Sequence, residues 1–206
     1  ATAPPTRIYF QQDAGANYDP ATQLDPLSGY PEACATGTLG TLCATSDALY
    51  NLGFDDFANF PNTGDAGLVM LDQAITLDEC GKLPEVGVLD SLANKKGKQD
   101  RIILASGYGL TYSSPVGVVS FCERLMAYGQ AINLNSANNG NGKGGACSGD
   151  SGGPIFYPAD SNTIVAVTSF GMNSWRRGVD FTFRVDTQEV QDWIARASAT
   201  SQRQLV

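Results

Sequence analysis

Residues 146–154 read ACSGDSGGP, and the interpretation of the whole chain depends on this stretch. A serine hydroxyl is a weak nucleophile that must be exposed, aimed and deprotonated before it can attack a carbonyl carbon. Glycines at 149, 152 and 153 allow a tight turn that a side chain would block. Such a turn can aim backbone N–H groups at a developing oxyanion. The stretch therefore predicts a nucleophile, Ser151, with the N–H groups of Gly149 and Ser151 as oxyanion donors.

The base that this serine needs is missing, because the chain contains no histidine. Histidine is the side chain that most often takes the proton from a nucleophilic serine. Lysine is an alternative base, and Lys143 is close in sequence. However, Lys143 lies in the Asn- and Gly-rich stretch 135–145, whose composition predicts a flexible loop. The sequence thus predicts a nucleophile whose base lies outside this chain, with a Ser–Lys arrangement as a minor alternative.

The chain has 206 residues and a net charge of −8. That length suits one domain, or one fold made of two small halves, with a real hydrophobic core. Acidic chains are repelled by phosphate backbones and anionic lipids, so neither nucleic acid nor a membrane is expected as a partner. No apolar run approaches the ~20 residues that span a bilayer. The 23 glycines and the many short strand-like segments are compatible with an extracellular all-β protein.

Five cysteines bear on metal binding and redox state: Cys34, Cys43, Cys80, Cys122 and Cys147. They show no CxxC pairing, which argues against a zinc site. In a secreted protein with disulfide bonds, an odd count leaves one thiol free or pairs it outside the chain, and the connectivity stays open. Asp13, Asp19 and Asp25 are spaced unlike a compact calcium loop, so no metal is expected.

Short apolar runs rich in β-branched residues predict strands at residues 7–12, 66–75, 101–109, 154–158, 163–171 and 179–185. Residues 116–135 fit either a strand pair or a helix, and one helical turn is expected around 89–94. In the segment 186–199, Val190, Trp193, Ile194 and Ala197 recur at helical spacing, which predicts an amphipathic helix. Asp186 followed by Glu189 resembles a capping box at the start of this helix.

The stretch 146–154 closely resembles the active-serine motif of the trypsin-like, chymotrypsin-fold serine endopeptidases. SGYG at 106–109 resembles the family's SGWG, and TSFG at 168–171 resembles its SWG. Upstream, NTGDAGLVMLD at 62–72 resembles the family segment NNDIALIKL, with Asp65 at the position of the triad acid. The resemblance implies that Asp65 would orient and stabilise a histidine without itself becoming protonated.

The resemblance implies an all-β fold of two antiparallel β-barrels, the first of them incomplete, followed by a C-terminal α-helix. Residues 1–80 would form the remainder of the first barrel with long loops. Residues 81–100 would be a linker, and residues 101–185 would form the second barrel, which carries the serine motif. Residues 186–199 would be the helix and residues 200–206 a tail.

The resemblance also implies substrate-binding residues: Gly145, Ala146, Ser169, Phe170, Gly171 and Asp180. Ser169 and Gly171 match the family segment that pairs with the substrate backbone, and Phe170 replaces its tryptophan. The positions that line the family's pocket before the serine are Gly145 and Ala146 rather than an aspartate. Asp180 falls near the opposite wall of that pocket, where a carboxylate would select basic side chains or would serve as a structural residue of a turn.

The chain departs from the family pattern at its beginning. RIYFQQD at 7–13 looks like the strand that follows the family's histidine turn, which would place that turn before residue 1. Bacterial and fungal members carry long loops like those expected here. The family's short apolar N-terminus, often IVGG, is absent, so Asp150 would pair with another cation or stand in an unformed pocket. Cys147 resembles a cysteine that the family bridges to a later one, and no cysteine follows it here.

Two functions of different classes follow. The first is a secreted serine endopeptidase, monomeric and without cofactor or metal, that acts on a polypeptide or meets a proteinaceous inhibitor. Its base would lie outside this chain, so the chain alone would be inactive or nearly so. The second is a non-catalytic homologue that binds a partner or peptide through the same cleft. The missing histidine favours the second function, and the intact GDSGG favours the first.

Overall fold

The computed structural model of the chain describes residues 6–10, 43–93, 101–114, 116–119, 123–133, 136–138, 144–171 and 178–201. Several residues that the sequence singles out lie outside these ranges: Asp13, Asp19, Asp25, Cys34, Cys122 and Lys143. The predicted strand at 7–12 is described only as far as Phe10. The division into domains at 80, 100 and 185 stays a prediction.

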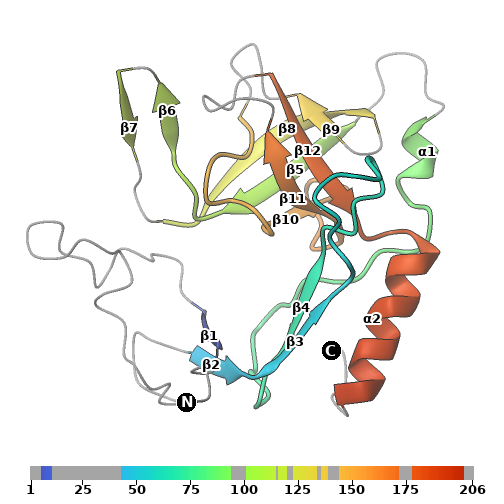
Figure 1. The fold of residues 1–206 in the computed structure, drawn as a ribbon. Helices are drawn as coiled ribbons and strands as arrows, with labels where there is room; N and C mark the ends of the chain where they lie inside the picture. The colour runs from blue at the N-terminus through green and yellow to red at the C-terminus, as the bar shows by residue number, and fades with distance from the viewer. Residues whose placement is uncertain are drawn as a thin grey trace, which may run out of the picture.

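Six strands of the second half form a closed antiparallel barrel (Figure 1). They are β5 (Ile102–Gly107), β8 (Leu125–Asn133), β9 (Ser136–Asn138), β10 (Pro154–Phe156), β11 (Ile164–Gly171) and β12 (Val179–Arg184). The barrel closes where β10 pairs with β5, with Ile155 opposite Ala105. Closure matters because it leaves no unpaired strand edge in the barrel that carries the serine motif.

The segment 116–135, which sequence periodicity left open, is β-structure where it is described. β6 (Tyr112–Ser114) pairs with β7 (Gly117–Val119), and β8 then runs antiparallel to β5 with Ala127 opposite Ala105. Pairing of β8 with β5 and β9 in the barrel therefore gives strands, in a segment whose own residues fit either structure.

The first half contributes two-stranded sheets, which Figure 1 shows beside the barrel. β1 (Thr6–Tyr9) pairs with β2 (Cys43–Ser46), and β3 (Ala48–Asn51) pairs with β4 (Gly67–Met70). In the ranges that the structure describes, these strands do not close into a second barrel. The prediction of an all-β fold with an incomplete first barrel and one C-terminal helix is confirmed.

The helix α2 (Gln188–Ser201) joins the two halves. Val190, Ile194 and Ala197 are buried at spacings of four and three residues, which puts them on one face. Val190 and Ile194 form a core cluster with Val185, and Leu68 of β4 packs against that cluster. A second cluster packs side chains of the segment around α1 against barrel strands, and its buried members are Leu89, Leu92, Ile103, Ile155, Val165 and Ala166. No helix in the described ranges is long and apolar enough to cross a bilayer.

The predicted capping box at Asp186 is wrong. The helix begins one residue later than that box requires, and the Val190 N–H donates to Thr187 Oγ1 at 3.4 Å, so Thr187 is the cap. Asp186 instead has a structural role. It is fully buried, and its Oδ2 accepts the Leu89 N–H at 2.8 Å. The carboxylate thus fastens the start of α1 (Asp90–Ala93) to the end of the barrel.

Arg184 neutralises this buried carboxylate. Its Nε donates to Asp186 Oδ1 at 2.7 Å, and its Nη2 donates to Asp90 Oδ1 at 2.8 Å. The hydrogen bond to Asp186 raises the pKa of the Arg184 guanidinium above its ordinary value. For the titration of the guanidinium itself, a raised pKa means that its contribution to stability is complete below the ordinary arginine pKa and is lost as the pH rises through the raised value.

We predict that Arg184→Ala destabilises the fold strongly. The substitution leaves the Asp186 carboxylate buried without its cation, which costs about 3 kcal/mol or more in free energy of unfolding. Arg196→Ala is the matched control, because Arg196 is exposed on α2 and the loss there should be below about 0.5 kcal/mol. Urea titration followed by circular dichroism measures both, and equal losses would contradict a structural role for this pair.

Candidate active site

Ser151 stands on a turn that glycines make possible. Gly149 and Gly152 have φ values of 99° and 82°, in the left-handed region that other residues rarely adopt. The turn is closed by two hydrogen bonds, from Asp150 N to the Cys147 carbonyl at 3.1 Å and from Gly153 N to the Asp150 carbonyl at 2.8 Å. The Ser151 side chain is exposed at the top of this turn.

The turn is fastened to β11 and has two backbone donors left over. Gly152 N donates to the Thr168 carbonyl at 2.8 Å, and Thr168 N donates to the Gly153 carbonyl at 2.9 Å. Within the part of the chain that the structure describes, the N–H groups of Gly149 and Ser151 have no acceptor. Two unused backbone donors that flank an exposed serine can stabilise negative charge on an oxygen bound between them.

Asp150 holds the turn against the barrel. Its Oδ1 accepts the Gly109 N–H at 2.7 Å, and its Oδ2 accepts the Cys147 N–H at 2.7 Å. Of the two alternatives for Asp150, a cationic partner is not seen, because no cation lies at ion-pair distance from this carboxylate in the described ranges. A Cβ added at Gly107 would lie 2.0 Å from Asp150 Oδ1, so the glycines of SGYG leave the room that the carboxylate occupies.

Asp65 and Ser151 each form a hydrogen bond with Ser169. The Ser169 hydroxyl donates a short hydrogen bond to Asp65 Oδ2, and the Ser151 hydroxyl donates to the Ser169 carbonyl at 3.4 Å. Gly64, with a φ of 63°, turns the chain into Asp65 just before β4. Residues 104 apart in sequence are thereby brought together. Sequence reasoning assigned Ser169 to substrate binding alone and missed its contact with the carboxylate.

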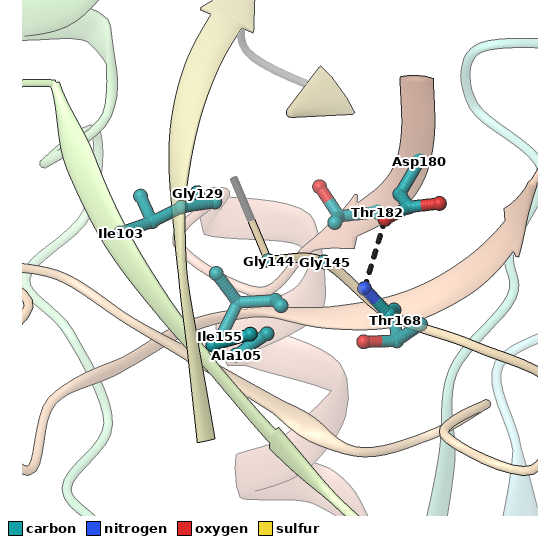
Figure 2. Close-up of a pocket in the computed structure, with 11 residues that line it drawn as sticks. Ile103, Ala105, Gly129, Gly144, Gly145, Ile155, Thr168, Asp180 and Thr182 are labelled. Atoms are coloured by element: carbon teal, nitrogen blue, oxygen red, sulfur yellow. Dashed lines mark hydrogen bonds between the residues drawn. The ribbon is translucent and has the colours of Figure 1, made fainter. Parts of the chain in front are cut away.

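The remaining predicted pocket residues also lie together (Figure 2). Gly145, Ala146 and Asp180 line one small cavity, in which Thr182 and Thr168 face Ile103 and Gly129 across the space. The cavity has about 20 Å³, which is room for about one water molecule and not for a lysine or arginine side chain. Asp180 is only 4% exposed, and its Oδ2 accepts the Ala146 N–H at 2.9 Å.

A much larger cleft opens at Ser151, with a volume of about 670 Å³. Its apolar lining includes aromatic rings from both halves of the chain, Tyr9, Phe10, Tyr108 and Phe156. Ser169 and Phe170 are not among the residues that line this cleft. The hydroxyl can therefore be reached by a large ligand.

This fold and this arrangement of Ser151, Ser169 and Asp65 define a protein of the chymotrypsin-like, two-barrel class. A model of the trypsin family matches residues 55–194, well over half of the chain, and the chain belongs to that family. No curated protein gives a significant match.

Solved structures agree on the fold. A mutant of human heparin binding protein superposes with a TM-score of 0.57 at 20% identity, over 81% of this chain and 71% of that one. Human heparin binding protein itself gives a TM-score of 0.56 at 20% identity, with the same coverage of 81% and 71%. At this identity the likeness shows the fold alone.

We predict that Gly107→Ala destabilises the turn under Ser151. The new methyl group would collide with the Asp150 carboxylate, so the free energy of unfolding should fall by about 1–3 kcal/mol. Gly117→Ala is the control, because an added Cβ there meets nothing within 4 Å. Thermal and urea unfolding of both variants decide the matter, and an unchanged Gly107→Ala protein would mean that the turn can shift freely.

Proposed function

We propose that the chain is the larger part of a secreted serine endopeptidase, in which Ser151 is the nucleophile and the base is supplied from outside these residues. The observation that carries the proposal is the double contact of Ser169, whose hydroxyl bonds to Asp65 and whose carbonyl accepts from Ser151. This contact keeps a carboxylate and an exposed serine hydroxyl around one residue. A base seated between them would be oriented by Asp65 and could take the Ser151 proton.

The reaction follows from these positions. Ser151 Oγ attacks the carbonyl carbon of a peptide bond, a C–O bond forms, and the hydroxyl proton passes to the base. The N–H groups of Gly149 and Ser151 stabilise the resulting oxyanion. The C–N bond then breaks, the amine leaves with the proton from the base, and water hydrolyses the acyl group on Ser151.

The proposed substrate is an extended polypeptide. The backbone of Ser169–Gly171 at the end of β11 would pair with it, and Gly145 with Ala146 would line the pocket for one side chain. The bond from the Ala146 N–H to Asp180 supports a structural role for this carboxylate. Selection of basic side chains by Asp180 would require the small cavity beside it to open.

A non-catalytic binding protein is the second candidate, and the absence of histidine favours it. The similar human structure is named a heparin binding protein. Heparin is a polyanion, and a net charge of −8 disfavours such a ligand here. A polypeptide or a proteinaceous inhibitor in the cleft beside Ser151 suits this chain better.

We predict that the chain alone hydrolyses peptides very slowly, because loss of a triad member costs about 10⁴–10⁶ in rate. A fluorophosphonate should label Ser151 slowly, and added imidazole should speed the labelling by acting as a mobile base. Mass spectrometry locates the adduct. Ser151→Ala should abolish labelling, whereas Ser148→Ala, an exposed serine three residues earlier, should not.

Three outcomes separate the candidate functions. Imidazole-dependent labelling at Ser151 supports the endopeptidase with an external base. Brisk peptide hydrolysis by the chain alone would contradict the external base. Absence of labelling, together with tight peptide binding, would favour the non-catalytic binding protein.

A further inference from the structure

The cleft beside Ser151 has a lining that the proposed reaction does not use. Its volume of about 670 Å³ falls within the range of about 300–1,000 Å³ that is typical of small-molecule sites. Such sites combine mainly hydrophobic and aromatic side chains with a few polar or charged groups. The cleft is distinct from the small cavity of Figure 2, because Gly145, Ala146 and Asp180 line that cavity and not the cleft. The cleft is therefore a second candidate binding site.

Four aromatic side chains line the cleft, and they come from both halves of the chain: Tyr9, Phe10, Tyr108 and Phe156. Tyr9 ends β1 and Phe10 follows it, Tyr108 follows β5, and Phe156 ends β10. Tyr108 is 40% exposed, and the other three are half-buried. We call these four residues the ring wall. Because the four rings border one open space, a single ligand can contact several of them at once.

Carboxylates predominate among the charged side chains of the cleft. Asp78 and Glu79 are exposed and line the cleft together with the ring wall. Asp150 is also in the lining, but its two oxygens accept backbone N–H groups. Among the lining residues that the structure describes, Arg124 is the one cation. The cleft thus carries an excess of negative charge, in a chain whose net charge is −8.

Aromatic rings next to carboxylates are suited to an organic cation. The face of an aromatic ring is negative, so a cation within about 6 Å of the ring centroid is attracted to it. Quaternary ammonium groups are recognised in this way by cages of several rings. Exposed carboxylates add an attraction of longer range, which salt at 0.1 M screens over about 10 Å. Both effects favour a ligand that is cationic and carries apolar groups.

An anionic ligand is the alternative that the backbone of the serine turn raises. The N–H groups of Gly149 and Ser151 have no acceptor in the described part of the chain, and both residues line the cleft. These two donors would attract an oxyanion at one end of the cleft. The Asp78 and Glu79 carboxylates would repel the same group, and the negative faces of aromatic rings do not attract it. The larger part of the lining therefore favours a cation.

We propose that the cleft binds a small organic cation, a quaternary or protonated amine that carries an aromatic or alkyl group. Its cationic group would lie against the ring wall near Asp78 and Glu79, and its apolar group would fill the rest of the cleft. The inference goes beyond the proposed function, because it requires neither a nucleophilic Ser151 nor a base. Since Gly149 and Ser151 line the same cleft, a bound ligand would also cover the candidate nucleophile.

Ligand-observed NMR titration of the full chain with three naphthalene compounds tests the inference. The probes are (2-naphthylmethyl)trimethylammonium, 2-naphthylmethanol and 2-naphthylacetate, which share one ring system and differ in charge. The ammonium probe should bind at least about 10-fold more tightly than the alcohol, and the acetate should bind most weakly. The advantage of the ammonium probe should shrink as NaCl rises from about 0.02 M to about 0.5 M. Equal affinities for the three probes, or tightest binding of the acetate, would overturn the proposal.

Variants assign the affinity to the ring wall and to the carboxylates. Tyr108→Leu keeps an apolar side chain and loses the ring, so it should reduce the advantage of the ammonium probe over the alcohol by about 3-fold or more, whereas Tyr108→Phe should keep it. Asp78→Asn combined with Glu79→Gln removes two exposed charges and should have a similar effect without changing the fold. Tyr128→Ala is the matched control, because Tyr128 is 62% exposed on β8 and does not line the cleft. An advantage that none of the cleft variants changes would place the ligand elsewhere and contradict the proposal.

A polypeptide side chain and a second copy of this chain are the competing occupants of the cleft, and each gives a different result. If a blocked arginine or lysine peptide binds and the ammonium probe does not, the cleft is a polypeptide site and the proposal fails. If sedimentation shows that Tyr108→Leu separates a dimer, and the ammonium probe binds neither the dimer nor the monomer, the cleft is an interface between copies and the proposal fails.

The cation site and the endopeptidase can fail separately. Binding of the naphthalene probes is measured without catalysis, and labelling of Ser151 by the fluorophosphonate is measured without the probes. Preference for the ammonium probe with no labelling of Ser151 would support the cation site and remove the endopeptidase. Labelling of Ser151 without that preference would do the reverse.

Discussion

The carboxylate of Asp150 is the point on which the site depends. It lies between the segment that follows β5 and the serine turn, and it accepts one backbone N–H from each, from Gly109 and from Cys147. A buried or half-buried carboxylate gains stability from such bonds, because amide donors replace the water it has lost. The turn cannot shift without breaking one of them. The direction in which Ser151 points is thus set by a residue that does no chemistry itself.

The Asp150 carboxylate and the turn beside it require glycine at several positions. At 107 and 109 any side chain would overlap Asp150, and at 149 and 152 the backbone needs the left-handed region. The string GDSGG and the distant SGYG are therefore two parts of one structural requirement. Ser169 links Asp65 to the serine turn. Its hydroxyl donates to Asp65, and its carbonyl accepts from the Ser151 hydroxyl.

Much of the fold and of the candidate site could be predicted from the sequence, because those parts depend on residues that are close together in the chain. The serine turn, the barrel strands and the C-terminal helix follow from glycine positions and from periods of two and 3.6 residues. Ser169 was found through its motif, but its bond to Asp65 was not, because the two residues are 104 apart and only the fold brings them together. The capping box failed for a tertiary reason, since the Leu89 amide and Arg184 compete for the Asp186 carboxylate.

Sequence could not predict the ring contacts of the 53–64 loop with Phe170 and Phe181 either, because these rings come from three separate segments. Phe54, Phe57 and Phe60 read as ordinary apolar residues in a loop, and neither a helical nor a strand period links them to Phe170. The backbone dihedral angles of the loop give information that the sequence pattern does not contain. Two consecutive left-handed residues would relax if nothing were gained from their conformation, and hydrogen bonds at the base of the loop prevent that relaxation. The hydrogen bonds at the base of this loop and the ring contacts with Phe170 and Phe181 therefore hold exposed aromatic side chains close to Ser169.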